Sequence, residues 1–192
     1  MTLNRGILGL LAVALAAWFS WWGYRTAVEQ ARPATRPASS GPDAFMEAMV
    51  LSTLDRQGRL RHRLWAERAR HYPRDDRTEL ERPRMAFYRD GRPGWRVEAA
   101  RGVLLAGGDE VRLAGGVDFR HPGGDGRLPA RGETDRLRLW PPRDYAETDA
   151  AVSYTNPRLR VNAVGLQAWL AEDRLRLRSQ VHARYLPREA RP

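Results

Sequence analysis

Short segments with a period of two constrain the fold of this chain most strongly. In each of them apolar residues occupy every second position and polar residues, mostly arginine, lie between; the segments are 60–66, 95–99, 136–139, 158–163 and 174–178. A period of two predicts β-strands with one face against an apolar interior and the other face in water. The chain is therefore expected to be all-β after its N-terminal part.

Turn-forming residues separate the strands, at 55–58, 90–94, 107–109, 123–126, 141–144 and 156–157. Equivalent positions recur at 67, 100, 135 and 164, at offsets of 33, 35 and 29 residues, and a second strand follows each after 17 residues. Such a repeat predicts hairpin-sized layers that stack along an axis. In the first layer Met85 and Phe87 suit the core better than Arg84 and Ala86, so its register stays open.

A stack of this kind has two ends with unpaired backbone groups. The candidates are the first strand, about 46–54, and the last, about 179–185. Such edges are either capped or recruit another chain by strand addition, and both alternatives remain open.

Residues 6–24 carry no charge and end in an aromatic cluster. As a helix they span roughly 28 Å, close to the ~30 Å hydrocarbon core of a bilayer. The aromatic side chains are typical of a collar at the membrane interface, namely Trp18, Trp21, Trp22 and Tyr24. This segment is predicted to be a single transmembrane helix.

A cleaved signal peptide is the alternative, but the apolar run is longer than a usual h-region and no clean cleavage site follows it. The prediction divides the chain into a cytoplasmic N-terminus (1–5), the helix (6–24), a flexible Pro-rich linker (25–42), an exported domain (43–187) and a tail (188–192).

Composition excludes several functions. The chain has no cysteine, which excludes disulfides, thiolate metal sites and a cysteine nucleophile. All 33 basic residues are arginine, so there is no Walker A lysine and no Schiff base. The net charge of +10 favours anionic partners; biased codon usage explains it equally well.

Catalytic motifs are not evident. No serine lies in a nucleophile elbow, and the histidines share no metal-ligand spacing; they are His62, His71, His121 and His182. The paired acids fall in or beside predicted turns, at 75/76, 109/110, 144/147 and 172/173. We expect no catalytic residues, no metal and no cofactor, and no nucleic-acid binding, since an exported domain rarely meets nucleic acid.

Several short motifs, in order, carry a resemblance to a known family. They are DAFM (43–46), LSTLDRQGRLRHRL (51–64), AER (66–68), HYP (71–73), TELERP (78–83), WRV (95–97), YAETD (145–149) and VGL (164–166). With the preceding apolar segment, their order and spacing resemble the LptC family, the single-pass component of the lipopolysaccharide export machine. The resemblance covers nearly the whole chain.

The resemblance implies an open β-jellyroll of stacked antiparallel strands, like that of LptA, in the periplasm of a Gram-negative bacterium and anchored in the inner membrane. It implies a non-enzymatic role: the roll accepts lipopolysaccharide from the LptF/LptG permease, which the LptB ATPase drives, and passes it to the bridge protein LptA. The alternative is a membrane-anchored envelope scaffold that binds proteins by strand addition but carries no lipid.

The resemblance also assigns roles to residues. The predicted lipid groove comprises Met49, Leu51, Leu64, Trp95, Val97, Leu113, Phe119, Leu137, Leu139, Tyr154, Val161, Leu177 and Tyr185. The N-terminal edge, expected to dock on the permease, comprises Met46, Val50, Ser52, Leu54 and Gly58. The C-terminal edge, expected to dock on the bridge, comprises Gly165, Ser179, Val181, Ala183 and Tyr185.

Overall fold

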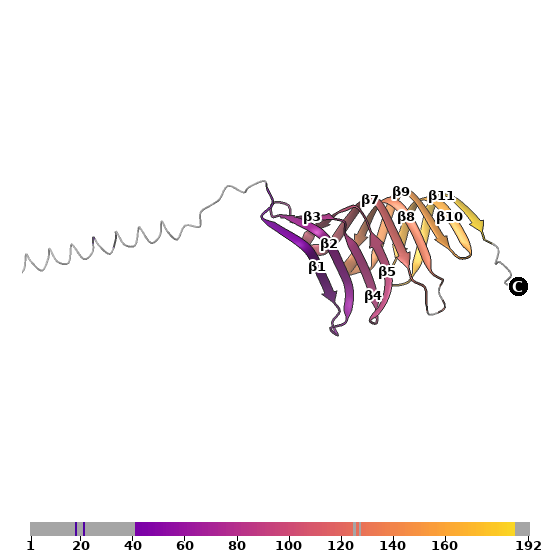
Figure 1. Cartoon of the computed structure of the whole chain (residues 1–192), viewed down its shortest axis with the longest axis horizontal. Coiled ribbons are helices and arrows are strands. Elements are labelled where there is room, and N and C mark those ends of the chain that lie inside the picture. Colours follow the sequence, from indigo (N-terminus) through magenta and orange to yellow (C-terminus); the bar gives the residue numbers. More distant parts are fainter. Residues whose placement is uncertain (1–17, 19–20, 22–40, 125, 127, 187–192) are drawn as a thin grey trace, which may run out of the picture. The chain divides into compact units, whose positions relative to one another are not determined.

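The computed structural model describes Trp18, Trp21 and residues 41–124, 126 and 128–186. The chain divides into two compact units, Met1–Ser39 and Ser40–Pro192. The second unit is an antiparallel roll (Figure 1) whose strands are β1 (Ala44–Leu54), β2 (Leu60–Tyr72), β3 (Arg77–Glu81), β4 (Arg84–Arg89), β5 (Arg92–Glu98), β6 (Arg101–Leu105), β7 (Glu110–His121), β8 (Ala130–Trp140), β9 (Tyr145–Asn156), β10 (Leu159–Trp169) and β11 (Arg174–Tyr185). Two short 3-10 turns, η1 (Ala106–Gly108) and η2 (Pro141–Arg143), complete it.

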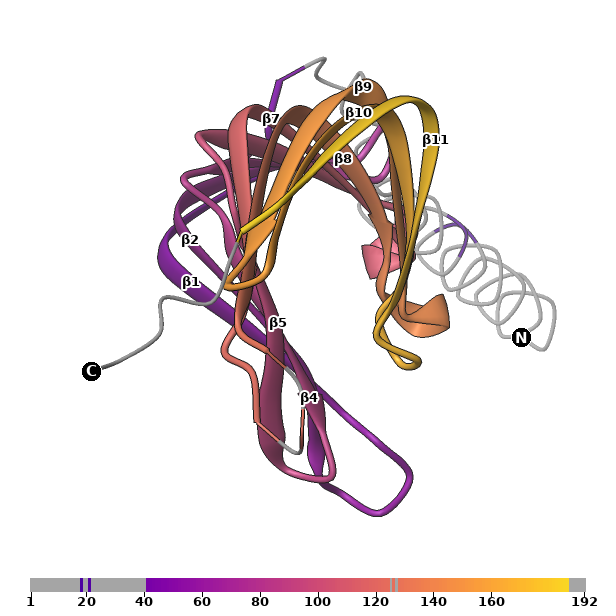
Figure 2. The same ribbon diagram turned by 90° about the vertical axis from the view of Figure 1, so that its right-hand side faces the viewer.

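The strands form one sheet that bends into two walls. Strand β2 pairs with β4 along His62–Trp65 and with β3 along its second half. Strand β7 likewise pairs with β6 along its first half and with β5 along its second. The layers therefore follow one another from β1 to β11 along the roll (Figure 1). Figure 2 looks along that axis and shows how the strands curve from one wall to the other.

Bends in the long strands produce the two walls. The pairing of β7 with β8 shifts between Ala114 and Val117. Gly115 and Gly116 lie in this interval with φ of 85° and 77°, a conformation that glycine adopts without steric cost. Strand β10 shifts register at Gly165 in the same way. These bulges bend each strand while keeping its apolar residues on the inner face.

The hairpins are connected by the predicted turn chemistry. In the β1–β2 turn, the Oδ1 atom of Asp55 accepts hydrogen bonds from the backbone N–H groups of Gln57 and Arg59, both at 2.9 Å. These bonds lower the pKa of Asp55, although desolvation partly opposes them. A short polar side chain thus fixes the turn that sets the register of β1 on β2.

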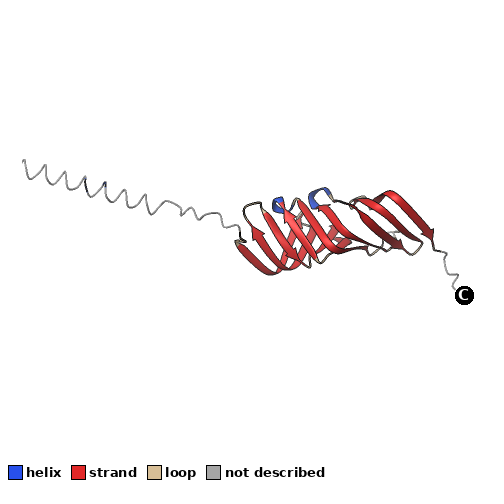
Figure 3. Ribbon diagram, turned by 90° about the horizontal axis from the view of Figure 1, so that it is seen from above, coloured by secondary structure: helices blue, strands red, loops and turns tan. Residues whose placement is uncertain are grey.

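The core lies between the walls. The apolar residues of the predicted alternation form one buried cluster, which includes Leu64, Trp95, Val97, Leu137 and Leu139. The register in the first layer is settled by the strand pairing, since Met85 lies opposite the buried Leu64 and Phe87 opposite the buried His62. On the other face Arg84 is exposed, although Ala86 is buried as well. The prediction of an all-β chain after residue 43 is confirmed in the described part of the domain (Figure 3).

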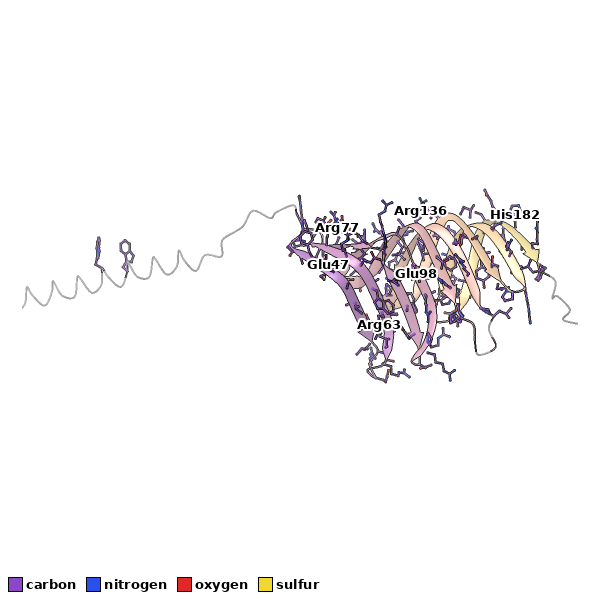
Figure 4. The ribbon with its side chains drawn as sticks, in the orientation of Figure 1. Glu47, Arg63, Arg77, Glu98, Arg136 and His182 are labelled. Atoms are coloured by element: carbon purple, nitrogen blue, oxygen red, sulfur yellow. The ribbon has the colours of Figure 1, made fainter. Side chains whose placement is uncertain are left out.

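Arginine and acidic side chains pair across the outer face of the roll, where Figure 4 labels Arg136 as one example. Arg136 lies 2.9 Å from Asp149, Arg138 lies 2.6 Å from Glu147 on the neighbouring strand, and Arg131 lies 2.7 Å from Asp118. Exposed pairs of this kind add little to stability, because water and salt screen the charges. They keep the outer face soluble and leave the inner face to apolar residues.

Candidate functional site

The inner face of the roll contains most of the predicted groove residues. Eight of them are buried, namely Leu64, Trp95, Val97, Leu113, Phe119, Leu137, Leu139 and Val161. Met49, Tyr154 and Leu177 are partly buried and pack against the same cluster. The structure thus brings these residues together in one cluster, except for Val161, which is buried outside it.

Leu51 and Tyr185 share the inner face but are 43% and 81% exposed. Leu51 is paired with the buried Leu64, and Tyr185 with Leu159. Residues directly opposite in an antiparallel pair lie on the same face, so both side chains face inward. They are exposed because β1 and β11 are the two ends of the stack.

The interior is packed. Beneath the walls, a void of about 20 Å³ is lined by residues that include Trp95, Phe119, Leu137 and Leu166. This volume accommodates roughly one water molecule. An acyl chain needs far more space, so the conformation described here is closed.

Both ends of the sheet are edges within the described part of the chain. Strand β1 pairs with β2 alone, and β11 pairs with β10 alone. Each edge is longer than predicted, because β1 begins at Ala44 and β11 begins at Arg174. Apolar side chains remain exposed along them, including Phe45, Val50, Leu54 and Val181.

Most of the predicted edge residues lie on the two edge strands, but two of them do not. Met46, Val50, Ser52 and Leu54 lie on β1, and Ser179, Val181, Ala183 and Tyr185 lie on β11. Gly58 instead lies in the β1–β2 turn, and Gly165 lies on β10, one strand inside the edge. Gly165 occupies a bulge where an added Cβ would lie 2.9 Å from the side chain of Arg178, so its place in the fold is structural.

The tips of the two walls meet along a line that we call the seam. From the second wall, Asp144 at the end of η2 has one carboxylate oxygen 2.7 Å from an Arg61 Nη and the other 3.0 Å from His62 Nε2. Arg61 also donates to the Pro142 carbonyl. Arg61, His62 and Asp144 form what we call the Asp144 cluster, in which the His62 ring also packs edge-on against Phe87.

A second cluster lies further along the seam. Asp173, in the β10–β11 turn, accepts a hydrogen bond from Trp95 Nε1 at 3.1 Å and pairs with Arg89 at 2.9 Å. His121 Nε2 lies 3.6 Å from the same carboxylate, and its ring packs edge-on against Trp95. Arg89 also donates to the carbonyls of Leu170 and Ala171. Arg89, Trp95, His121 and Asp173 form the Asp173 cluster.

Sequence reasoning missed these clusters, although a signal was present. It noted Asp144 and Asp173 only as acids in turns, and the histidines as ordinary strand or turn residues. Asp76, Asp109, Asp144 and Asp173 follow one another at the same intervals of 33, 35 and 29 residues as the repeat. The repeat therefore places an aspartate at each tip of the second wall.

The Asp144 cluster predicts a specific pH dependence of stability. Desolvation raises the pKa of Asp144, but hydrogen bonds from His62 and Arg61 outweigh it and bring the pKa below the ordinary value of 3.8. A carboxylate with a lowered folded-state pKa contributes stability above its unfolded-state pKa and loses it as the pH falls through the folded-state value. We expect Asp144→Asn to lower the urea midpoint at neutral pH. The difference from wild type is expected to shrink as the pH falls below about 4 and to vanish below the folded-state pKa of Asp144. Urea titrations at several pH values measure this; a constant difference would contradict the role of the charge.

The predicted anchor, linker and tail lie outside the described residues, apart from Trp18 and Trp21, whose rings are 6.2 Å apart. No helix among the described residues is long and apolar enough to cross a membrane. Among the same residues, no group of three or more His, Asp or Glu side chains is arranged to hold a metal ion.

Comparisons with known proteins agree with this geometry. Residues 9–186 match the family model described as LptC, "Lipopolysaccharide-assembly, LptC-related". No curated protein matches the chain. Among solved structures, LptH of Pseudomonas aeruginosa, the LptA homologous periplasmic component of the lipopolysaccharide transport device, is similar with a TM-score of 0.53. The match has 6% identity and covers 66% of this chain and 95% of LptH, and it shows that the fold is an LptA-like jellyroll.

Proposed function

Since the chain belongs to the LptC family and has a role in lipopolysaccharide transport, we propose that its roll accepts lipopolysaccharide from an inner-membrane ABC transporter and passes it to a periplasmic bridge protein. The observation that carries the proposal is the apolar inner face, which runs from the free edge of β1 to the free edge of β11. The family is a non-enzymatic component of the cell envelope. No chemical step is needed for this role.

The physics of lipid transfer supports a continuous apolar path. Each CH₂ group exposed to water costs about 0.8 kcal/mol, so a lipid with several acyl chains cannot cross the aqueous periplasm unprotected. A roll with two free edges can be extended by strand addition at both ends. We propose that β1 docks on the LptF/LptG permease, which LptB drives, and that β11 docks on LptA, while residues 6–24 anchor the chain in the inner membrane.

A second candidate is an envelope scaffold that binds proteins through its edges and carries no lipid. The packed interior favours it, because the void there holds no more than about one water molecule. The two candidates make opposite predictions about lipid on the inner face.

Photo-crosslinking in cells separates the two candidates. Leu51 and Tyr185 face inward at the two ends, whereas their neighbours Ser52 and Arg184 pair with Arg63 and Arg160 on the outer face. With a photoreactive amino acid at each position in turn, we expect lipopolysaccharide adducts at 51 and 185 at least about tenfold more abundant than at 52 and 184, because acyl chains avoid the aqueous face. Protein adducts without lipid adducts at all four positions would favour the scaffold.

A further inference from the structure

The seam encloses a pocket whose lining differs from the interior. Its volume is about 940 Å³, and five arginines and four aspartates line it, together with Trp95 and Leu170. The arginines come from the β1–β2 turn, the start of β2 and the β4–β5 hairpin, namely Arg56, Arg59, Arg61, Arg89 and Arg92. The pocket therefore gathers guanidinium groups beside an apolar floor. Arg59, Arg61 and Arg89 are paired with aspartates of the same lining.

The seam pocket adjoins the apolar interior. Trp95 and Leu170 line both the pocket and the void beneath it. Trp95 is 5% exposed, and its indole N–H donates to Asp173. The Asp173 cluster thus holds in place a side chain that separates the two spaces.

The contacts of the two clusters across the seam are made through side chains. Arg61 and His62 of β2 hold Asp144, while Arg89 of β4, Trp95 of β5 and His121 of β7 hold Asp173. The walls, in contrast, are joined along their strands by backbone ladders. Separation at the seam breaks these contacts and the core packing beneath them but no backbone ladder, so the seam is the line along which the closed roll can open without unpairing its strands.

A phosphate group resembles the carboxylates already bound there. Arginine binds carboxylate and phosphate in the same bidentate geometry, and phosphate offers more acceptor oxygens and more charge. An anionic headgroup in the pocket therefore competes with Asp144 for Arg61 and with Asp173 for Arg89. Once the phosphates hold Arg61 and Arg89, the hydrogen bonds from these arginines to the carbonyls of Pro142, Leu170 and Ala171 break as well, and the tips of the second wall are then free.

From these observations we propose that the seam pocket is a headgroup site for a phosphorylated lipid. The phosphates displace Asp144 and Asp173 from Arg61 and Arg89, the seam opens at Trp95 and Leu170, and the acyl chains reach the apolar inner face. This inference rests on the proposed function. It adds the place where the headgroup binds and the event that opens the roll.

Two double variants break the same ion pairs, one by changing the aspartates and the other by changing the arginines. Asp144→Asn with Asp173→Asn removes the competitor of the phosphate and leaves the arginines in place. Arg61→Gln with Arg89→Gln removes the phosphate ligands. We expect the first pair to raise the affinity of the full-length chain for lipopolysaccharide. We expect the second pair to lower it at least about tenfold, since the charge-assisted hydrogen bonds from two guanidinium groups to the phosphates are lost. A merely structural role would shift both affinities in the same direction, which would overturn the proposal.

Opening is measured as a distance. The chain has no cysteine, so spin labels attach only at cysteines that are introduced. Gln57 and Glu172 are exposed residues in turns of opposite walls, and labels at Gln57→Cys and Glu172→Cys therefore report the width of the seam. Pulsed electron resonance on the full chain in detergent is expected to show a longer distance with lipopolysaccharide. Enzymatically dephosphorylated lipopolysaccharide and inorganic phosphate alone are expected to leave the distance near that of the free chain.

Controls separate this inference from the proposed function. Asp149→Asn removes an exposed outer pair with Arg136 and is expected to change neither affinity nor distance, and circular dichroism verifies that every variant folds. Lipopolysaccharide that binds without widening the seam, or equally well after dephosphorylation, overturns the headgroup site but leaves lipid transport intact. A wild-type chain that binds no lipid overturns both.

Discussion

Substitution of Gly132 by alanine is expected to destabilise the roll by about 3 kcal/mol or more. Gly132 on β8 is paired with Phe119 on β7 and Tyr154 on β9. A Cβ at this position would lie 2.5 Å from Phe119 Cε2 and 2.6 Å from the carbonyl oxygen of Ser153. Overpacking against a side chain costs about 1–3 kcal/mol. The effect here belongs at or above that range, because the carbonyl is part of a strand and cannot move aside freely.

Denaturant unfolding of the full chain measures this effect, and the chain offers a matched control. Gly41 has no atom within 4 Å of an added Cβ, so Gly41→Ala is expected to change stability by no more than about 0.5 kcal/mol. Phe119→Leu lacks the ring atoms that Cβ would meet, and it should recover part of the loss when combined with Gly132→Ala. Equal stability of the two alanine variants would show that β7 and β9 do not approach β8 as described.

Leu139→Ala is expected to cause the second large loss of stability. Leu139 is fully buried in the middle of the core, and removal of a buried leucine side chain costs about 2–5 kcal/mol through lost transfer free energy and the cavity left behind. We expect a loss of about 4 kcal/mol, measured from the urea midpoint, because the surrounding strands are held by ladders on both sides and collapse little into the cavity.

Leu51→Ala is the matched comparison, since the sequence assigned Leu51 and Leu139 to the same groove. Leu51 is 43% exposed on the edge strand, so the same change is expected to cost less than about 1 kcal/mol. Similar losses in the two variants would show that β1 is covered in solution, for instance by another chain at its free edge.

The period-two pattern predicted the strands and their inner faces well. Leu64, Trp95, Val97 and Leu139 were all assigned correctly to the apolar interior, because alternation is a local property of a strand and the burial of one face follows from it. The two free edges also followed from the repeat, since a stack of layers has two ends. Local patterns were weaker where a bulge intervenes, as at Gly165, because one extra residue changes which face the following positions occupy.

The clusters at the seam could not be derived from the sequence. Arg61 and Asp144 lie 83 residues apart, and neither stands in a motif that points to the other. Their meeting depends on the bends of β7, β8 and β10, which bring the tips of the second wall to the first. Nor could the sequence distinguish an open groove from a closed core, since both have the same alternating pattern.

The sequence by itself determined an all-β chain of stacked hairpin layers, with an apolar inner face, a charged outer face and two ends available for pairing. Periodicity and turn chemistry suffice for this because they act over a few residues. The tertiary structure alone decided that the walls close on a packed interior and that aspartates at the tips of one wall meet arginines and histidines of the other. Contacts of that kind depend on the total bending that twist and bulges produce over many strands. No short stretch of sequence determines that total, because each strand contributes only a part of it.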